Sequence, residues 1–139
     1  MYQGIYEIIS NKQLTESIFE MKLKGDTTSI TAPGQFVNIK LDGMFLRRPI
    51  SVCDYNSSEL VLIYKAVGKG TEKMSKMAAG ETLDILVGLG NGFDMSKSGD
   101  VPVLIGGGVG IPPMYGLAKR LIADGKKVKV ILGFNTQDE

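Results

Sequence analysis

Short segments in which apolar and polar side chains alternate follow one another through the first hundred residues. Residues 17–24 place Phe19, Met21 and Leu23 on one face of an extended chain and charged residues on the other, and residues 36–41 alternate in the same way. A period of two is typical of strands with one buried and one solvated face. These segments therefore predict half-buried antiparallel strands.

Two further segments, residues 60–64 and 83–87, are more continuously apolar, which predicts strands covered on both faces. Turn-forming residues separate the predicted strands at Ala32-Pro33-Gly34, Leu41-Asp42-Gly43 and Tyr55-Asn56-Ser57-Ser58. Several short strands at this spacing indicate a small antiparallel barrel or sandwich over residues 1–98.

One short helix is predicted within this strand-rich region. Thr71 is the expected N-cap, and Met74, Met77 and Ala78 follow at the spacing of one helical face. Gly80 is placed to end the helix.

The hydrophobic period changes after residue 98. Residues 101–105 predict an apolar strand, a glycine cluster follows, and Pro112 and Pro113 stand where a helix can begin. Apolar residues at helical spacing then predict an amphipathic helix closed by Gly125, and residues 127–133 predict a second strand. This is one right-handed βαβ unit. Because one helix covers only one face of a parallel sheet, we expect residues 99–139 to begin a longer α/β domain or to be completed by another chain.

Composition and charge exclude several classes of function. The 16 Lys+Arg and 15 Asp+Glu leave a net charge of +1, which gives no general attraction to nucleic acid or anionic membranes. The chain has no histidine and one cysteine, so we expect no internal disulfide and no transition-metal site. Histidine is also the commonest general base, and its absence counts against a hydrolase. No apolar run reaches the length of a membrane span, and the first residues begin a polar, alternating segment. We therefore expect no signal peptide and a cytoplasmic protein.

The segment Arg48-Pro49-Ile50-Ser51 has the chemistry of a phosphate site. The guanidinium of Arg48 can donate two parallel hydrogen bonds to a phosphate and keeps its charge. We interpret Ser51 as pointing to the same side of the strand as Arg48, where its hydroxyl can reach a flavin ring. Gly70 and Thr71 open the short helix, whose free N–H groups favour the same pyrophosphate. The alternatives are an exposed arginine pair before an ordinary strand, and simple helix capping.

Two other features allow more than one interpretation. Tyr64, between Ile63 and Lys65, suits either a ring stacked on a flavin or adenine or a tyrosine of the core, and Lys65 adds positive charge. The glycine cluster at 106–110 does not match the G-x-G-x-x-G dinucleotide fingerprint. It still leaves a strand-to-helix junction bare of side chains, which lets a nucleotide approach the backbone. A tight turn without a ligand is the alternative.

Together these motifs resemble the ferredoxin reductase superfamily, and within it the electron-transfer subunits of NAD-dependent dihydroorotate dehydrogenase. The residues that carry the resemblance, in chain order, are Arg48-Pro49-Ile50-Ser51, Gly70-Thr71, Leu89-Gly90-Asn91-Gly92-Phe93, the stretch from Gly106 to Tyr115, and Leu132-Gly133-Phe134. The resemblance implies an antiparallel barrel that binds FAD and an α/β domain that binds NAD. It also implies a [2Fe–2S] centre held by a cysteine cluster that these 139 residues lack.

The resemblance assigns a cofactor to each motif. FAD would contact Arg48, Pro49, Ile50, Ser51, Ile63, Tyr64, Lys65, Gly70 and Thr71, and NAD would face Gly107, Gly108 and Gly110. No residue is expected to act as a catalytic acid or base or to bind a metal. The implied protein is an oxidoreductase subunit of pyrimidine biosynthesis that connects NAD(H), through the iron–sulfur centre, to an FMN-containing catalytic subunit in a heterotetramer.

Two other functions fit the same sequence. One is a different flavin reductase subunit, of the ferredoxin–NADP reductase or sulfide dehydrogenase type. The other is a binding barrel without redox chemistry, akin to small nucleic-acid-binding barrels. The near-neutral charge and an aromatic content of only 7% count against the nucleic-acid-binding barrel.

Overall fold

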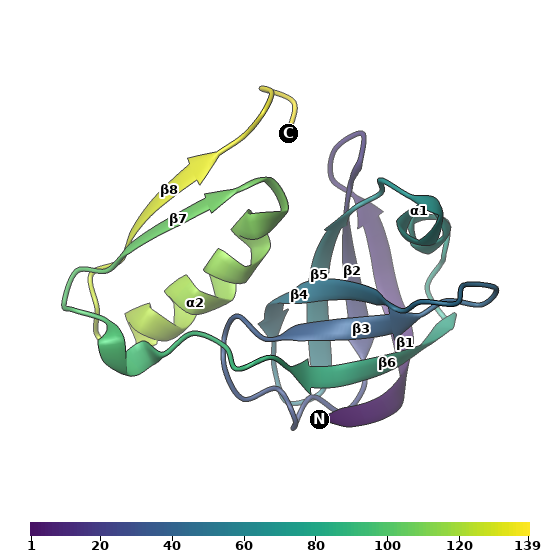
Figure 1. Ribbon diagram of the computed structural model, residues 1–139, viewed down its shortest axis with the longest axis horizontal. Helices are drawn as coiled ribbons and strands as arrows, with labels where there is room; N and C mark the ends of the chain where they lie inside the picture. Colours follow the sequence, from purple (N-terminus) through teal and green to yellow (C-terminus); the bar gives the residue numbers. More distant parts are fainter.

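The computed structural model describes residues 1–139 as a closed barrel beside a βαβ unit (Figure 1). Six antiparallel strands form the barrel in the spatial order β1-β2-β5-β4-β3-β6. Their bounds are β1 (Tyr2–Gln13), β2 (Ile18–Lys24), β3 (Phe36–Lys40), β4 (Arg48–Tyr55), β5 (Glu59–Lys65) and β6 (Thr82–Leu89). Closure pairs every strand on both sides, which removes open sheet edges. Of the barrel and the sandwich that the alternation allowed, the barrel, which the family resemblance also implied, is confirmed.

The alternating residues fill the barrel interior. Met21 and Leu23 of β2 pack against Leu60 and Leu62 of β5, within a core of sixteen buried residues. Burying a side chain of this size contributes about 1.5–3 kcal/mol. The expectation that β5 and β6 are covered on both faces is wrong in part. Outward residues such as Ile63 are only half-buried, because little packs on the outside of the barrel.

The short helix α1 (Lys69–Ser75) lies across one end of the barrel (Figure 1). Its N-cap is Gly68, and Thr71 is the third helical residue, so the prediction of Thr71 as N-cap is wrong. The Thr71 hydroxyl instead reaches back and accepts hydrogen bonds from the N–H groups of Val67 (3.0 Å) and Gly68 (3.2 Å). The helix ends at Ser75 rather than near Gly80.

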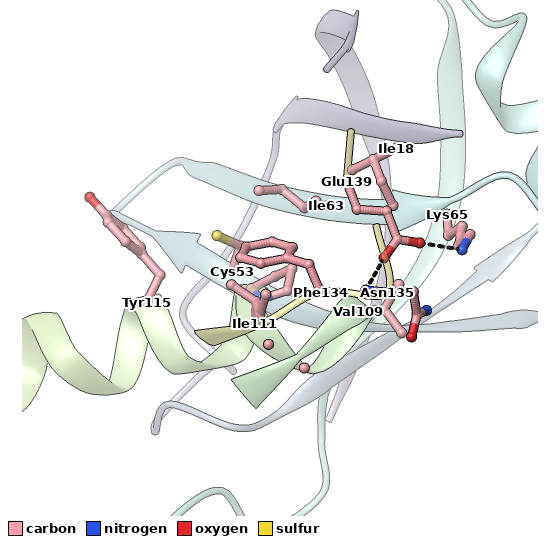
Figure 2. A pocket seen from close by; sticks show the side chains of 14 residues that line it. Ile18, Cys53, Ile63, Lys65, Val109, Ile111, Tyr115, Phe134, Asn135 and Glu139 are labelled. Atoms are coloured by element: carbon pink, nitrogen blue, oxygen red, sulfur yellow. Dashed lines mark hydrogen bonds and ion pairs between the residues drawn. The ribbon is translucent and has the colours of Figure 1, made fainter. Parts of the chain in front are cut away.

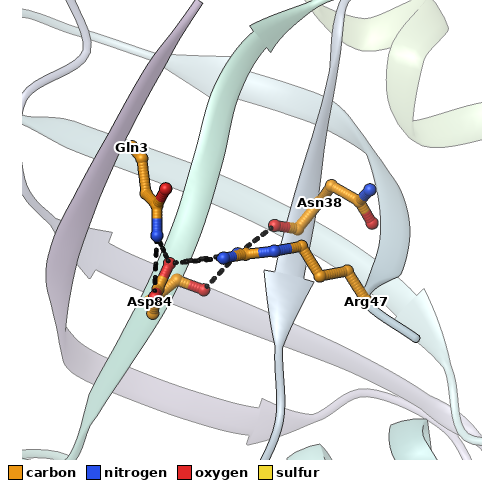
Figure 3. A network of polar contacts seen from close by, with 4 residues as sticks. All are labelled: Gln3, Asn38, Arg47 and Asp84. Carbon is orange, nitrogen blue, oxygen red and sulfur yellow. Dashed lines mark hydrogen bonds and ion pairs between the residues drawn. The ribbon is translucent and has the colours of Figure 1, made fainter. Parts of the chain in front are cut away.

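A polar network on the barrel wall holds Arg47 (Figure 3). Its guanidinium donates to the carboxylate of Asp84 on β6 at 3.0 Å and to the backbone oxygen of Asn38 on β3 at 3.3 Å. Gln3 of β1 donates to the same carboxylate at 3.0 Å. Burial opposes ionisation of Asp84, but the hydrogen bonds from Arg47 and Gln3 outweigh it and lower the pKa of Asp84. Arg47 therefore connects β3 and β6 to the segment that leads into β4.

The second part of the chain begins after a short 3-10 turn at Met95–Lys97. Strand β7 (Val103–Gly107), a 3-10 turn at Gly108–Gly110, helix α2 (Ile111–Ala123) and strand β8 (Lys129–Gly133) form the predicted βαβ unit, with β7 and β8 parallel. Prolines occupy the first turn of α2, and Gly125 follows its end with φ +81°. No helix of the chain is long and apolar enough to cross a membrane.

Helix α2 covers one face of β7, while β8 and the opposite face of the sheet are exposed. Leu117 and Leu121 of α2 pack on Leu104 of β7. Ile105 and its partner Ile131 point away from α2 and are 71% and 56% exposed. A single helix covers one face only, as the sequence argument anticipates.

Candidate functional site

A cavity of about 800 Å³ lies between the barrel and the βαβ unit, beside the direct contact of α2 with β4. Its size is in the range of small-molecule and cofactor sites, roughly 300–1,000 Å³. The lining residues are Ile18, Cys53, Ile63 and Lys65 of the barrel, Gly107, Gly108, Val109, Ile111, Pro112 and Tyr115 of the glycine junction and α2, and Gly133, Phe134, Asn135 and Glu139 of the C-terminal segment. Figure 2 shows Ile63 and Cys53 on the barrel side opposite Ile111 and Val109.

Four residues predicted from the sequence meet in this cavity, from two regions of the chain. Ile63 and Lys65 reach it because alternate residues of β5 point out of the barrel. Gly107 and Gly108 face them at the strand-to-helix junction. A β-carbon on Gly108 would meet no atom within 4 Å, so this wall is open backbone. Gly110 does not line the cavity.

Tyr64 lies on the opposite side of β5, inside the barrel. Its side chain is 1% exposed, its ring stacks on Phe19 with centroids 5.8 Å apart, and its hydroxyl donates to Asn11 Oδ1 at 2.9 Å. Burial raises the pKa of Tyr64 to about 12, and the Asn11 hydrogen bond opposes that rise. Of the two interpretations of Tyr64, the core tyrosine is correct for the side chain. Only its backbone remains available to a ligand on the outer face.

Arg48 lies at the α1 end of the barrel, outside the cavity. Its side chain crosses Gly70 so closely that a β-carbon there would fall 2.3 Å from Arg48 Nε. The guanidinium donates to the backbone oxygen of Leu46 at 2.6 Å and takes part in none of the ion pairs of the chain. The structure thus brings the predicted cation and the predicted glycine together and leaves the positive charge without a carboxylate partner.

Ser51 does not share a side of β4 with Arg48, and that prediction is wrong. The β3–β4 pairing runs without a bulge from Ile39 opposite Arg48 to Phe36 opposite Ser51. Residues three apart in an uninterrupted strand point to opposite faces. Ile50 packs on the barrel core, which leaves Pro49 and Ser51 on the outer face.

Cys53 is a cavity residue that the sequence did not identify as part of a site. It is the extra residue of a bulge, because Val52 pairs with Leu62 while Asp54 pairs with Val61. Burial raises the pKa of its thiol to about 11, with further contributions from Asp54 and Glu20. No sequence signal marks the bulge.

Aromatic residues of the cavity were also missed. Tyr115 lies beside the apolar stripe of α2 and is exposed, and Phe134 follows β8. Tyr115 could have been predicted as a cavity residue from the sequence, because it is an aromatic residue beside the apolar face of the predicted helix.

Lys65 forms an ion pair with the carboxylate of Glu139 inside the cavity. Its Nζ lies 3.0 Å from Glu139 Oε1, and the backbone N–H of Asn135 donates to Glu139 Oε2 at 2.9 Å (Figure 2). The Asn135 N–H, followed by Lys65, lowers the pKa of Glu139. The carboxylate shows where a charged oxygen group is accommodated next to Ile63.

Comparison with known proteins places this site in a family context, although no family model matches the chain. An electron transfer subunit of dihydroorotate dehydrogenase B (NAD(+)) from Bacillus mycoides (strain KBAB4) is 42% identical over 94% of this chain and 54% of its own length. The subunit of the same name from Bacillus pumilus (strain SAFR-032) is 41% identical over 100% of this chain and 57% of its own length. The chain is a homologue of these electron transfer subunits. It spans little more than half of their length.

Solved structures show the same architecture. An NADH-dependent reduced ferredoxin–NADP oxidoreductase aligns over 97% of this chain and 50% of its own, with a TM-score of 0.87 and 32% identity. Phthalate dioxygenase reductase aligns over 95% of this chain and 43% of its own, with a TM-score of 0.79 and 21% identity, a likeness of fold alone. The barrel and βαβ unit therefore have the fold of ferredoxin reductase-type domains.

Proposed function

We propose that this chain is the FAD-binding part of an oxidoreductase subunit that transfers electrons between NAD(H) and a protein partner. The observation that carries the proposal is the bare backbone of Gly107 and Gly108 facing Ile63 and Lys65 across one cavity. Two walls from different domains allow two ring systems to be held face to face. The homologous electron transfer subunits support this interpretation.

The chain carries groups that fit a flavin dinucleotide. Arg48 is a cation without a carboxylate partner, and Gly70 beside it has no side chain to block approach. Arg48 would bind the pyrophosphate, with the backbone of Gly70 and Thr71 beside it, and Pro49, Ile50 and Ser51 would border the cofactor along β4. Lys65, which already holds a carboxylate, would bind a further polar group.

The distance from Lys65 in the cavity to Gly70 beside Arg48 suits one extended cofactor. Lys65 and Gly70 are five residues apart, so the connecting chain spans at most about 17 Å. Ile63, Lys65 and the backbone of Tyr64 would border the cavity portion of the cofactor, while Arg48 and Gly70 would hold its middle. Bound FAD supplies the redox chemistry, and the chain supplies position, charge and exclusion of water.

The nicotinamide nucleotide would approach from the other wall. Gly107, Gly108 and Gly110 would face it, because a junction without side chains lets phosphate and ribose come close to the backbone ahead of α2. No side chain lining the cavity needs to act as an acid or base for this transfer.

For the whole protein we propose the function of the homologous subunits. It would pass electrons through a [2Fe–2S] centre to an FMN-containing dihydroorotate dehydrogenase catalytic subunit, in a cytoplasmic heterotetramer that serves pyrimidine biosynthesis. The names of the relatives support the partner. A reductase subunit with another acceptor is the second candidate, favoured by the 32% identity to the NADH-dependent ferredoxin–NADP oxidoreductase. Electron delivery to the catalytic subunit rather than to ferredoxin distinguishes the two.

The first experiment is to purify the chain, record its visible spectrum and titrate it with FAD. We expect a yellow protein that releases FAD on denaturation. Arg48→Ala should raise the dissociation constant for FAD about tenfold or more, because a charge-assisted hydrogen bond contributes about 1.5–3 kcal/mol. Arg120→Ala, on the exposed side of α2, is the control. A colourless chain that also fails to take up added FAD would contradict the proposal and favour the binding barrel.

A further inference from the structure

Helix α2 rests on the barrel through a residue without a side chain. A β-carbon on Gly116 would lie 2.8 Å from the carbonyl oxygen of Cys53 on β4. Real β-carbons do not approach a backbone oxygen so closely, so any other residue at 116 must push α2 and β4 apart. At Gly116 the helix therefore packs so closely on the strand that a side chain has no room.

The bulge at Cys53 creates this contact. An extra residue in one strand bends the strand and redirects its side chain and carbonyl. At Cys53 the side chain borders the large cavity (Figure 2), while the backbone carbonyl oxygen faces Gly116 of α2. One residue of the barrel thus borders the cavity and also supports the helix beyond it.

An ion pair one helical turn along α2 lies on the same side. Lys119 Nζ is 2.9 Å and 3.1 Å from the two carboxylate oxygens of Asp54. Lys119 is largely exposed, and exposed ion pairs contribute little to stability. The ion pair accompanies the contact, but it does not limit how closely the helix approaches β4.

The position of α2 determines the width of the cavity. The glycine junction ends where α2 begins, and Ile111, Pro112 and Tyr115 of the helix line the cavity themselves. A helix moves as a rigid element over so few residues. A shift of α2 away from β4 therefore carries Gly107 and Gly108 away from Ile63 on the barrel side.

We propose that Gly116 is a positioning residue, which sets the separation between the flavin wall and the nicotinamide wall of the cavity. The inference rests on the proposed function and deepens it. It requires no contact between Gly116 and either cofactor. Gly116 acts through the carbonyl of Cys53 and the placement of α2.

The test compares Gly116→Ala and Gly116→Val with the wild-type chain, each loaded with FAD. We expect unchanged FAD content and affinity, because Arg48 and Gly70 lie at the other end of the barrel. Anaerobic titration with NADH should then show a long-wavelength charge-transfer band, which requires the two rings to stack. In Gly116→Ala we expect roughly tenfold weaker NADH binding by this band, since small misplacements of reacting groups have large effects. Gly116→Val should lose the band.

Lys119→Ala is the matched control, because it removes the ion pair of the same helix face and adds no atom at the contact. Alanine favours helix more than glycine does, so the milder variant keeps its fold, which circular dichroism verifies. An unchanged band in Gly116→Ala would overturn the inference and leave the proposed function standing. A wild-type chain that takes up FAD but shows no band with NADH would instead contradict the proposed nicotinamide site.

Discussion

The guanidinium of Arg48 lies directly against Gly70, with Arg48 Nε only 2.3 Å from where a β-carbon of residue 70 would stand. Residues 22 positions apart in the chain thus form one unit. The arginine motif of β4 and the start of α1 can serve the same phosphate only because of this contact. Its disruption should therefore affect cofactor binding more than folding.

Gly70→Ala tests that relationship directly. The added carbon must displace the Arg48 side chain, and we expect FAD affinity to fall about tenfold, as for loss of one charge-assisted hydrogen bond. Flavin fluorescence titration measures it. The control is Gly68→Ala, since a β-carbon there meets no atom within 4 Å and φ of −156° suits any residue. Equal FAD affinity in both variants would remove the role of the Arg48–Gly70 contact.

Tyr64→Phe separates the core role of Tyr64 from a cofactor role. The change removes the hydrogen bond to Asn11, whose amide nitrogen also donates to the backbone oxygens of Met74 (2.8 Å) and Met77 (2.9 Å). We expect a loss of about 1–3 kcal/mol in the free energy of unfolding, measured by urea denaturation, because a buried acceptor loses its partner. FAD affinity should remain unchanged.

Lys65→Ala should weaken FAD binding and change the free energy of unfolding little, which is the opposite of the result expected for Tyr64→Phe.

Arg47→Ala should destabilise the barrel without releasing FAD. Arg47 donates to Asp84 and to the backbone of β3, so its loss removes hydrogen bonds to acceptors on two strands and the positive charge beside Asp84. We expect a cost of about 1–3 kcal/mol in urea denaturation at pH 7. A yellow variant with a lower urea midpoint would agree with this role, whereas loss of flavin at full stability would contradict it.

The same network predicts a specific response to acid. The pKa of Asp84 in the folded chain is below its ordinary value of 3.8, so the network contributes stability above that value. This contribution disappears as pH falls through the lowered pKa and the carboxylate becomes protonated. In urea denaturation below about pH 4, wild type should therefore lose more stability than Asp84→Asn. Parallel curves for the two proteins would show that Asp84 is not a source of acid sensitivity.

Cys53 should be chemically inert in the folded chain. Its thiol pKa is raised to about 11, first by burial, and the thiolate is the reactive form. At pH 8 we expect reaction with a disulfide reagent to be at least tenfold slower than in urea. Time-dependent absorbance at pH 8 and pH 10 measures it. A fast reaction at pH 8 in the folded chain would show that the thiol is more accessible than the cavity geometry allows.

Local pattern was sufficient for the larger elements. Alternation over residues 17–24 and 36–41 predicted the strands, and the spacing of Leu117 and Leu121 predicted α2, because a buried face requires these periods in any fold. The same reasoning failed at Thr71, where a hydroxyl suits either an N-cap or a residue that reaches back to one. It also failed for Ser51, because residues three apart in an uninterrupted strand point to opposite faces, so Ser51 and Arg48 cannot share one.

The sequence alone determined β2, β3, β5 and β6 of the barrel, the βαβ unit, the glycine junction and the presence of a cation at residue 48, since each follows from interactions among near neighbours. The tertiary structure alone decided that Tyr64 faces inward, that Arg48 meets Gly70, and that the bulge at Cys53 supports α2 at Gly116. These relationships join residues distant in the chain. They depend on barrel closure and strand register, which no local pattern encodes.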